Sequence, residues 1–192
     1  MTGRLQGKTS IVTGAASGFG KGIAAKFVAE GANVIIADLS EEQGLAVAKE
    51  LGSQSTFVRA DVTSVADWES LLQTALTQFN GLDIVVNNAG ASYANKATEE
   101  VTEKEFDMTI NVNLKGIFHS VNVLVPYFLR ENRPGCFIQV ASTAGSRPRP
   151  RLTWYNASKA AVINASKTMA VEYGPKQIRF NTVSPVVGST GM

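Results

Sequence analysis

Short apolar runs alternate along the chain with longer segments in which apolar residues recur at helical spacing. The short runs are rich in Val and Ile, as expected of strands that are buried on both faces. We predict strands at Thr9–Thr13, Asn33–Asp38, Ser55–Arg59, Leu82–Asn87, Cys136–Ala141 and Arg179–Ser184. We predict helices at Gly20–Glu30, Glu41–Leu51, Val65–Phe79, Glu103–Arg130 and Thr153–Tyr173. The alternation favours an α/β fold with a doubly wound parallel sheet in three α/β/α layers.

Several residues are suited to begin or end these helices. Ser40 and Ser64 precede two predicted helices, where a hydroxyl group caps the first turn. Glycines in the left-handed conformation are expected just past four helix ends, at Gly31, Gly52, Gly81 and Gly174. No repeat or low-complexity linker interrupts the pattern, so we expect residues 1–192 to form a single domain.

The composition is typical of a soluble globular protein, with 44% hydrophobic and 18% charged residues. A net charge of +2 gives no reason to expect nucleic acid or a membrane surface as a partner. The single cysteine cannot form an internal disulfide, which suits a reducing compartment. No signal-like segment precedes the first strand, and no apolar run approaches the ~20 residues that span a bilayer. We therefore expect a cytoplasmic protein.

The first predicted strand leads into a turn of small residues, Thr-Gly-Ala-Ala-Ser-Gly-Phe-Gly, at positions 13–20. Small residues let the backbone turn tightly and bring its amide groups close to a pyrophosphate at a helix N-terminus. We expect this turn to bind a dinucleotide through Gly14, Ser17, Gly18, Phe19 and Gly20. The alternative is a tight strand–helix turn without a ligand.

An acidic residue, Asp38, ends the second predicted strand. A carboxylate at this position is suited to hydrogen-bond an adenosine ribose, and it would repel a 2′-phosphate. No Arg or Lys stands at Ala37, Leu39 or Ser17 to bind such a phosphate. The sequence therefore favours NAD over NADP.

A phenol, an ammonium and a hydroxyl form the candidate catalytic set. Tyr155 and Lys159 are four residues apart near the start of a predicted helix, so they share a face. A free phenol is a poor base at neutral pH, but a neighbouring ammonium favours its phenolate form. Ser142 follows a buried strand at the carboxyl edge of the sheet, where its hydroxyl is suited to bind a substrate oxygen. The alternative for Ser142 is a serine that caps its own turn.

Taken together, these segments resemble the short-chain dehydrogenase/reductase family over essentially the whole chain, from about Leu5 to Met192. Residues 13–20 match its TGxxxGxG motif, Asn87–Gly90 match its NNAG segment, and Tyr155 and Lys159 match its YxxxK motif. The resemblance implies a Rossmann-like sheet and an NAD-dependent enzyme that interconverts a secondary alcohol and a ketone. Tyr155 would be the acid/base, and Lys159 would also hold the nicotinamide ribose.

The resemblance adds further expected cofactor contacts. Asp61 and Val62 follow the third strand, where the family touches adenine. Asn88, Ala89 and Gly90 close the fourth strand within the NNAG segment. These five residues are therefore expected to line the nucleotide site.

Asn113 is implied as the fourth catalytic residue. It begins Asn-Leu-Lys-Gly, similar to the NxxG segment in which an asparagine distorts a helix and holds a water beside the lysine. Asn111 lies two residues upstream, and the glycine at position 116 favours Asn113. The implied relay runs from the substrate oxygen through Tyr155, a ribose hydroxyl, Lys159 and water to Asn113.

The last segment resembles the family's N-x-x-S-P-G sequence followed by a threonine. Pro185 and Thr190 are implied cofactor contacts, with Thr190 bonded to the nicotinamide carboxamide. Val186 stands where glycine is usual. Members of the family continue past this point into a substrate loop, a helix and a last strand, which we expect to be missing here.

Three other residues, Cys136, His119 and Trp68, are expected to be structural, and the role of Trp154 stays open. Cys136 and His119 lie in apolar segments, and neither belongs to a cluster of metal ligands, so we expect no metal site. Trp68 is expected to pack in its helix. Trp154 precedes Tyr155 and is a candidate for the substrate entrance.

Three arginines, Arg147, Arg149 and Arg151, alternate with prolines in a stiff loop before Tyr155. One interpretation is a solvated or subunit-contact loop. The other is recognition of a carboxylate or phosphate on the substrate, for which the guanidinium group is well shaped.

The predicted activity leaves the substrate open. A 3-oxoacyl thioester (acyl-carrier-protein) reductase and a sugar or polyol dehydrogenase, similar to a glucose dehydrogenase, both fit the motifs. A dinucleotide-binding regulatory protein without turnover, and an inactive short form that joins full-length subunits, are the alternatives from other classes. Segments Leu114–Leu129 and Ala157–Ala170 are suited to contact another subunit, so we expect a homodimer or homotetramer.

Overall fold

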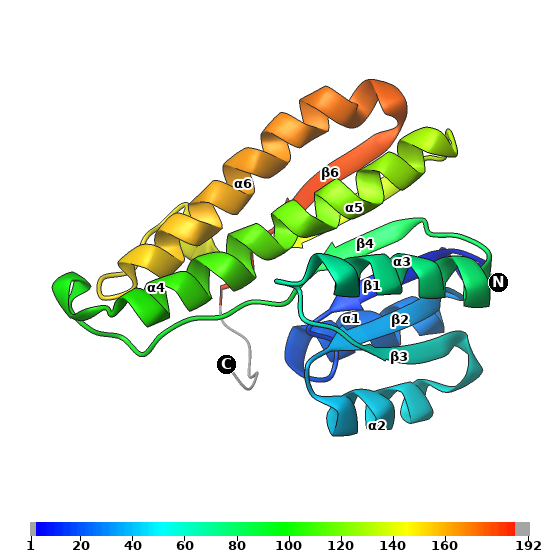
Figure 1. The fold of residues 1–192 in the computed structure, drawn as a ribbon, viewed down its shortest axis with the longest axis horizontal. Helices are drawn as coiled ribbons and strands as arrows, with labels where there is room; N and C mark the ends of the chain where they lie inside the picture. The colour runs from blue at the N-terminus through cyan, green and yellow to red at the C-terminus, as the bar shows by residue number, and fades with distance from the viewer. Residues whose placement is uncertain (1–2, 187–192) are drawn as a thin grey trace.

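A parallel sheet forms the centre of the molecule, and its strands follow the order β3-β2-β1-β4-β5-β6 (Figure 1). The structure is a computed structural model that describes residues 3–186. The strands are β1 (Thr9–Thr13), β2 (Asn33–Asp38), β3 (Ser55–Arg59), β4 (Ile84–Asn87), β5 (Gly135–Val140) and β6 (Ile178–Val183). Adjacent pairs are parallel and in continuous register, for example Ile11 with Ile35 and with Val85. The predicted doubly wound parallel sheet is confirmed.

The helices lie in the connections between strands. They are α1 (Gly18–Ala29), α2 (Glu41–Leu51), α3 (Val65–Phe79), α4 (Glu103–Ile110), α5 (Gly116–Arg130) and α6 (Thr153–Tyr173). A π-helical turn, η3 (Asn111–Lys115), joins α4 to α5. Short 3₁₀ turns are η1 (Gly52–Gln54), η2 (Thr98–Glu100), η4 (Thr143–Gly145) and η5 (Gly174–Lys176).

Helices cover the sheet on two faces, each with its own apolar core. On one face Phe137 packs in a cluster with Leu71 of α3 and Leu124 of α5. On the other face Ile36 packs in a cluster with residues of α1 and α2, among them Ala24 and Val47. Strand residues point alternately to the two faces, so apolar residues at successive positions serve both cores. This confirms the three predicted layers.

The long helix predicted at Glu103–Arg130 is the main departure from the sequence analysis. Figure 1 shows α4, η3 and α5 as one continuous rod, but the rod contains the π turn at Asn111–Lys115. A π turn takes one more residue per hydrogen-bonded ring than an α-helix and is frequently found at functional sites. The helix distortion that the family resemblance implies at Asn113 is therefore present.

Smaller differences concern the ends of the elements. The bounds of α1, β4, β5 and β6 shift from the prediction by one or two residues, as expected where terminal hydrogen bonds are borderline. Gly174 has a φ of −52°, so the prediction of a left-handed cap there was wrong; Gln177, at the end of η5, takes that conformation with a φ of 58°. Ser64 accepts a capping hydrogen bond from Asp67 N, whereas Ser40 makes no side-chain cap.

The order of the strands determines where a crevice forms. The chain passes from β1 outward to β2 and β3, and then returns to β4 on the other side of β1. The connections that leave β1 and β4 therefore diverge to opposite faces and open a crevice at the carboxyl ends of the strands. The residues singled out at positions 13–20 and 87–90 lie at this edge.

Candidate functional site

The turn after β1 has a backbone that only small residues accommodate. Gly14 and Gly18 have φ values of 62° and 53°, in the region that glycine adopts without strain. A Cβ atom on Gly20 would lie 2.0 Å from the carbonyl oxygen of Gly14. Gly20 therefore permits the close approach between the first turn of α1 and the end of β1, and it backs the cavity rather than lining it.

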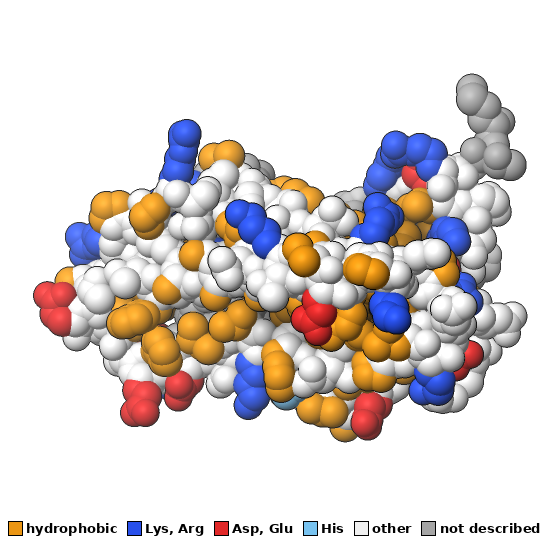
Figure 2. Space-filling model, turned by 90° about the horizontal axis from the view of Figure 1, so that it is seen from above, with side chains coloured by type: hydrophobic (Ala, Val, Ile, Leu, Met, Phe, Trp, Pro, Cys, Tyr) orange, Lys and Arg blue, Asp and Glu red, His pale blue; other side chains and the backbone are white. Residues whose placement is uncertain are grey.

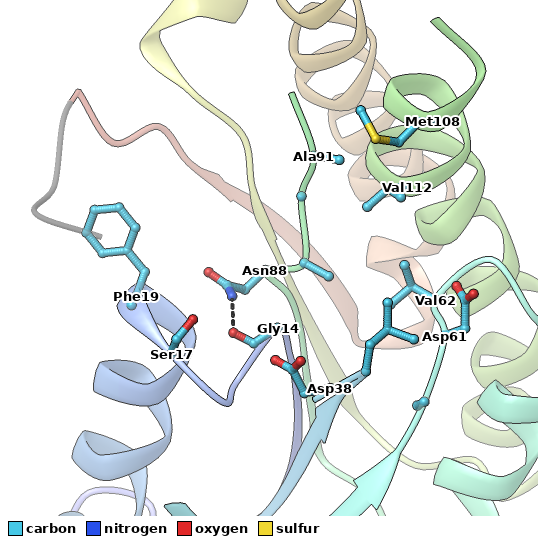
Figure 3. Close-up of a pocket in the computed structure, with 15 residues that line it drawn as sticks. Gly14, Ser17, Phe19, Asp38, Asp61, Val62, Asn88, Ala91, Met108 and Val112 are labelled. Atoms are coloured by element: carbon cyan, nitrogen blue, oxygen red, sulfur yellow. Dashed lines mark hydrogen bonds between the residues drawn. The ribbon is translucent and has the colours of Figure 1, made fainter. Parts of the chain in front are cut away.

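Asn88 ties this turn to the end of β4. Its side-chain amide donates to the carbonyl oxygens of Thr13 (2.8 Å) and Gly14 (3.1 Å), and Figure 3 draws the second of these bonds. The hydroxyl oxygen of Thr13 accepts from the backbone N–H groups of Asn88 and Ala89, each at 3.0 Å. These bonds hold the two segments on either side of the crevice in a fixed relation.

A cavity of about 430 Å³ lies above the glycine turn (Figure 3). The predicted cofactor residues that line it are Gly14, Ser17, Gly18, Phe19, Asp38, Asp61, Val62, Asn88, Ala89 and Gly90. The lining residues that the sequence analysis missed are Leu39, Ala60, Ala91, Met108 and Val112. Leu39, Ala60 and Ala91 are sequence neighbours of predicted residues. For Met108 and Val112, the only signal in the sequence is their spacing of four residues, which places them one helical turn apart.

The two acidic residues of this cavity also hold its backbone. Asp38 accepts hydrogen bonds from Ala16 N (2.9 Å) and Ser40 N (3.0 Å), so its carboxylate lies between the glycine turn and the end of β2. Asp61 accepts from the N–H and hydroxyl of Thr63, at 2.8 and 2.7 Å. Asp38 accepts one of these bonds at each carboxylate oxygen, and Asp61 accepts both at Oδ1, so both groups can still accept a hydrogen bond from a ligand.

A second cavity, of about 500 Å³, adjoins the first because the two share Phe19, Asn88 and Gly90. It is lined by the predicted residues Ser142, Tyr155, Lys159 and Pro185. The sequence motifs at the ends of β1, β4 and β5 and at the start of α6 thus line one long crevice. Thr190 lies outside the described residues.

Lys159 is buried at the floor of the second cavity, with 4% of its surface exposed. Its Nζ atom donates to the carbonyl oxygen of Val140 at 2.9 Å and lies 5.8 Å from the centre of the Tyr155 ring. Burial lowers the pKa of Lys159 from 10.5 to about 8, because an ammonium loses hydration in this environment. Lysine and tyrosine share a helix face, as their spacing predicts.

Asn113 lies behind the crevice in the middle of the π turn and is 1% exposed. Its side-chain oxygen accepts from Ala91 N (2.8 Å), and its amide donates to Ala91 O (2.9 Å) and Ser158 Oγ (3.0 Å). A Cβ atom on Gly90 would lie 3.3 Å from Asn113 Oδ1 and 3.4 Å from Lys159 Nζ. Gly90 therefore separates the asparagine from the lysine without filling the space between them.

Ser158 extends this network and was missed by the sequence analysis. Its hydroxyl donates to the backbone carbonyl of Tyr155 at 2.7 Å while it accepts from Asn113. The π turn is thereby connected to the helix that carries Tyr155 and Lys159. The contact joins residues 45 positions apart, so no local pattern could have indicated it.

Ser142 caps the turn that follows β5 and also lines the second cavity. Its hydroxyl oxygen accepts from Ala144 N at 3.1 Å, which caps the 3₁₀ turn η4 after β5. It also lines the cavity that Tyr155 lines. Because the cap uses the oxygen as an acceptor, the hydroxyl proton remains available to donate to a ligand.

The tryptophans, the cysteine and the histidine lie away from this chemistry. Trp68 is 1% exposed and donates to the carbonyl of Val62 at 3.0 Å. Trp154 packs edge-on against Phe106, with ring centres 5.2 Å apart, and does not line the cavity, so its proposed place at the substrate entrance was wrong. Cys136 is half-buried, and burial raises the pKa of its thiol. His119 is 8% exposed in α5.

Replacing Lys159 with Met is expected to stabilise the ligand-free protein at pH 7 by about 1–3 kcal/mol, because it removes the cost of burying a charge. The folded-state pKa lies below the unfolded one, so this cost is complete below about pH 8 and fades as the pH approaches 10.5. Urea denaturation of both proteins at pH 7 and pH 10.5 measures the difference. An equal gain at both pH values would contradict a charge-burial origin.

The chain matches a family model described as short chain dehydrogenase over residues 8–192. It is 43% identical to 4-formylbenzenesulfonate dehydrogenase of Comamonas testosteroni over 98% of this chain and 75% of that protein. It is 38% identical to 3-alpha-(or 20-beta)-hydroxysteroid dehydrogenase of Mycobacterium bovis over 100% of this chain and 73% of the relative.

A solved structure has the same fold. It is the 3-ketoacyl-(acyl-carrier-protein) reductase of Brucella melitensis complexed with NADH, with a TM-score of 0.95 and 38% identity. The match covers 97% of this chain and 78% of that one. Within residues 3–186, the helices are all too short or too polar to cross a membrane.

Proposed function

This chain belongs to the short chain dehydrogenase family, and we propose that it transfers a hydride between NAD and the carbon of a secondary alcohol or ketone. One observation carries the proposal. Tyr155, Ser142 and Lys159 line one cavity, and this cavity adjoins the cavity above the glycine turn. The candidate proton-transfer group and the candidate nucleotide cavity therefore lie in one continuous crevice.

The residues of the crevice suit a nicotinamide dinucleotide. The cavity above the glycine turn is bounded by the N-terminus of α1, whose free backbone N–H groups and dipole favour a pyrophosphate. Asp38 at the end of β2 is placed to accept from a ribose hydroxyl. When bound, the dinucleotide supplies the hydride acceptor or donor.

The chain's own residues divide the remaining work. Tyr155 takes the proton of the alcohol in oxidation and returns it in reduction. The Lys159 ammonium favours the phenolate, and the Ser142 hydroxyl donates to the substrate oxygen as charge develops on it. Asn113 is a positioning residue that connects Ala91, in the segment after β4, to Ser158, the neighbour of Lys159 in α6.

The preference for NAD is attributed to Asp38. Among residues 3–186, none of those that line the nucleotide cavity is Lys or Arg, so a 2′-phosphate would meet a carboxylate and no compensating cation. The NADH complex of the Brucella relative supports the choice of cofactor.

Replacing Asp38 with Asn is expected to reduce the preference for NAD⁺ over NADP⁺ by at least about tenfold, because about 1.4 kcal/mol of repulsion is removed. The side-chain oxygen of Asn retains an acceptor for one of the two backbone N–H groups, of Ala16 and Ser40, that bind the two carboxylate oxygens of Asp38. The ratio of kcat/KM for the two cofactors measures the change. An unchanged ratio would show that the carboxylate does not set the preference.

The substrate class is tested with a panel of alcohols. The named relatives act on a formylbenzenesulfonate, on hydroxysteroids and on acyl-carrier-protein thioesters. We propose a secondary alcohol, with a 3-hydroxyacyl thioester and a sugar or polyol as the two narrower candidates. Formation of NADH from NAD⁺ with each class, at equal substrate concentration, discriminates among them. Binding of NAD⁺ without turnover of any class would instead favour a regulatory dinucleotide-binding protein.

We further propose a cytoplasmic dimer or tetramer that associates through α5 and α6. The exposed large apolar residues of this helix pair are Phe118, Leu129 and Val171. Figure 2 shows hydrophobic side chains along the face seen from the α6 side of the molecule, between separated charges. Burial of such a surface in a second copy would remove apolar area from water. Light scattering of the purified protein measures the assembly.

A further inference from the structure

The charges in the second cavity are unevenly distributed. Its walls are largely apolar and aromatic, with Phe19, Tyr93 and Leu152 among them. Arg149 and Lys159 are its charged lining residues, and within residues 3–186 no acidic side chain lines it. A cleft with low-dielectric walls and cations alone concentrates a positive potential, which favours an anionic ligand.

The two cations occupy different positions in this cavity. Lys159 is buried beside Tyr155 and hydrogen-bonded to Val140 O, so its charge lies next to the phenol that we propose as the acid/base. Arg149 is exposed, and its guanidinium Nη2 donates to the carbonyl of Val186 at 3.2 Å. That bond uses one of five N–H donors. The guanidinium therefore retains a planar set of donors at the rim of the cavity.

The backbone of Arg149 is held in place relative to the reacting group. Asn156, the neighbour of Tyr155, is 7% exposed, and its side-chain amide donates to Arg149 O at 2.7 Å. Pro148 and Pro150 flank the arginine and restrict φ on both sides of it. Arg147 and Arg151 belong to the same loop but do not line the cavity. Among the three arginines, Arg149 alone meets the requirements for ligand recognition.

We propose that Arg149 binds a carboxylate or sulfonate group at the far end of the substrate from its alcohol carbon. This inference rests on the proposed function and specifies its substrate class: an alcohol or carbonyl compound with an apolar body and an acidic end. A guanidinium pairs with two oxygens of such a group through parallel hydrogen bonds, which an ammonium cannot reproduce.

A matched pair of alcohols tests the proposal. The protein is assayed with NAD⁺ and either 4-(1-hydroxyethyl)benzoate or its methyl ester, which lacks the negative charge and carries one additional methyl group. Arg149→Ala is expected to lower kcat/KM for the acid by about 10- to 100-fold and to leave the ester within about threefold. Arg149→Lys is expected to recover only part of the loss. Arg147→Ala, the matched control in the same loop, should change neither substrate.

A binding measurement separates failure of this proposal from failure of the proposed function. Titration calorimetry of 4-ethylbenzoate into the NAD⁺-saturated protein should show a Kd that rises about 10-fold or more in Arg149→Ala and is unchanged in Arg147→Ala. If no alcohol is oxidised but this difference is found, the activity is wrong and the anion site stands. If the ester and the acid are oxidised equally and the variants bind 4-ethylbenzoate alike, the activity stands and the Arg149 proposal is overturned.

Discussion

Tyr155→Phe is expected to lower kcat by roughly 10²- to 10⁴-fold, the range for loss of a positioned acid/base. The substitution removes only the phenolic oxygen, and the ring can keep its place above Lys159, whose Nζ lies 5.8 Å from the ring centre. The dissociation constant of NAD⁺ should change by less than about threefold, because the glycine turn, Asp38 and Asn88 are untouched. Steady-state kinetics and titration calorimetry measure the two quantities.

Tyr93 provides a matched control for this experiment. It is a second phenol that lines the same cavity, and its hydroxyl oxygen accepts from Trp154 N at 3.0 Å. Tyr93→Phe removes an equivalent atom at a cost of about 1 kcal/mol in stability and should retain most of the turnover. Equal losses in both variants would mean that Tyr155 acts through the shape of the cavity, and the acid/base role would have to be abandoned.

Gly20→Ala is expected to damage both the fold and the nucleotide site. The added Cβ would lie 2.0 Å from Gly14 O and 2.6 Å from Asn88 Nδ2, and neither group can move without breaking the bonds between β1 and β4. We expect a loss of about 1–3 kcal/mol in the free energy of unfolding. We also expect at least a tenfold weaker affinity for NAD⁺, because the turn that carries Gly14 and Gly18 is displaced. Urea denaturation and calorimetry test both expectations.

Gly22, two residues along the same helix, is the control. A Cβ atom there would meet no other atom within 4 Å. Gly22→Ala should therefore stabilise the protein by about 0.5–1 kcal/mol, since alanine favours a helix interior more than glycine does. If the two variants unfold alike, the close contact at Gly20 does not govern the turn.

The fold could be predicted from the sequence because its strands are buried on both faces. A short continuous apolar run such as Val34–Ala37 is stable mainly as a strand of a sheet that helices cover on both faces, because all of its side chains are then buried. The glycine turn was predictable for a related reason: its small residues stand directly between a strand and a helix. Local pattern and global fold agree in these segments.

The parts that could not be predicted depend on contacts between distant segments. Met108 and Val112 reach the nucleotide cavity only because α4 and the π turn pack beside it. Trp154 faces Phe106 rather than the crevice, which depends on how α4 approaches α6. The four-residue spacing of Tyr155 and Lys159 predicted that they share a helix face. The burial that lowers the pKa of Lys159 could not be predicted in this way, because it comes from β5 and the loops around it.

The direction in which the side chains of α4 and α5 point depends on the number of residues in the π turn that joins the two helices. Each residue of a helix corresponds to a rotation of roughly 100° about its axis. With the extra residue at Asn111–Lys115, α4 directs Met108 toward the crevice while α5 directs Leu124 and Phe128 into the sheet core. Deleting a single residue there would rotate α4 relative to α5 by roughly 100°, so that either Met108 would point away from the crevice or Leu124 and Phe128 would point away from the sheet core. We therefore expect an insertion or deletion in Asn111–Lys115 to separate the crevice from the core, whereas an exchange of residue type leaves the two in the same relation.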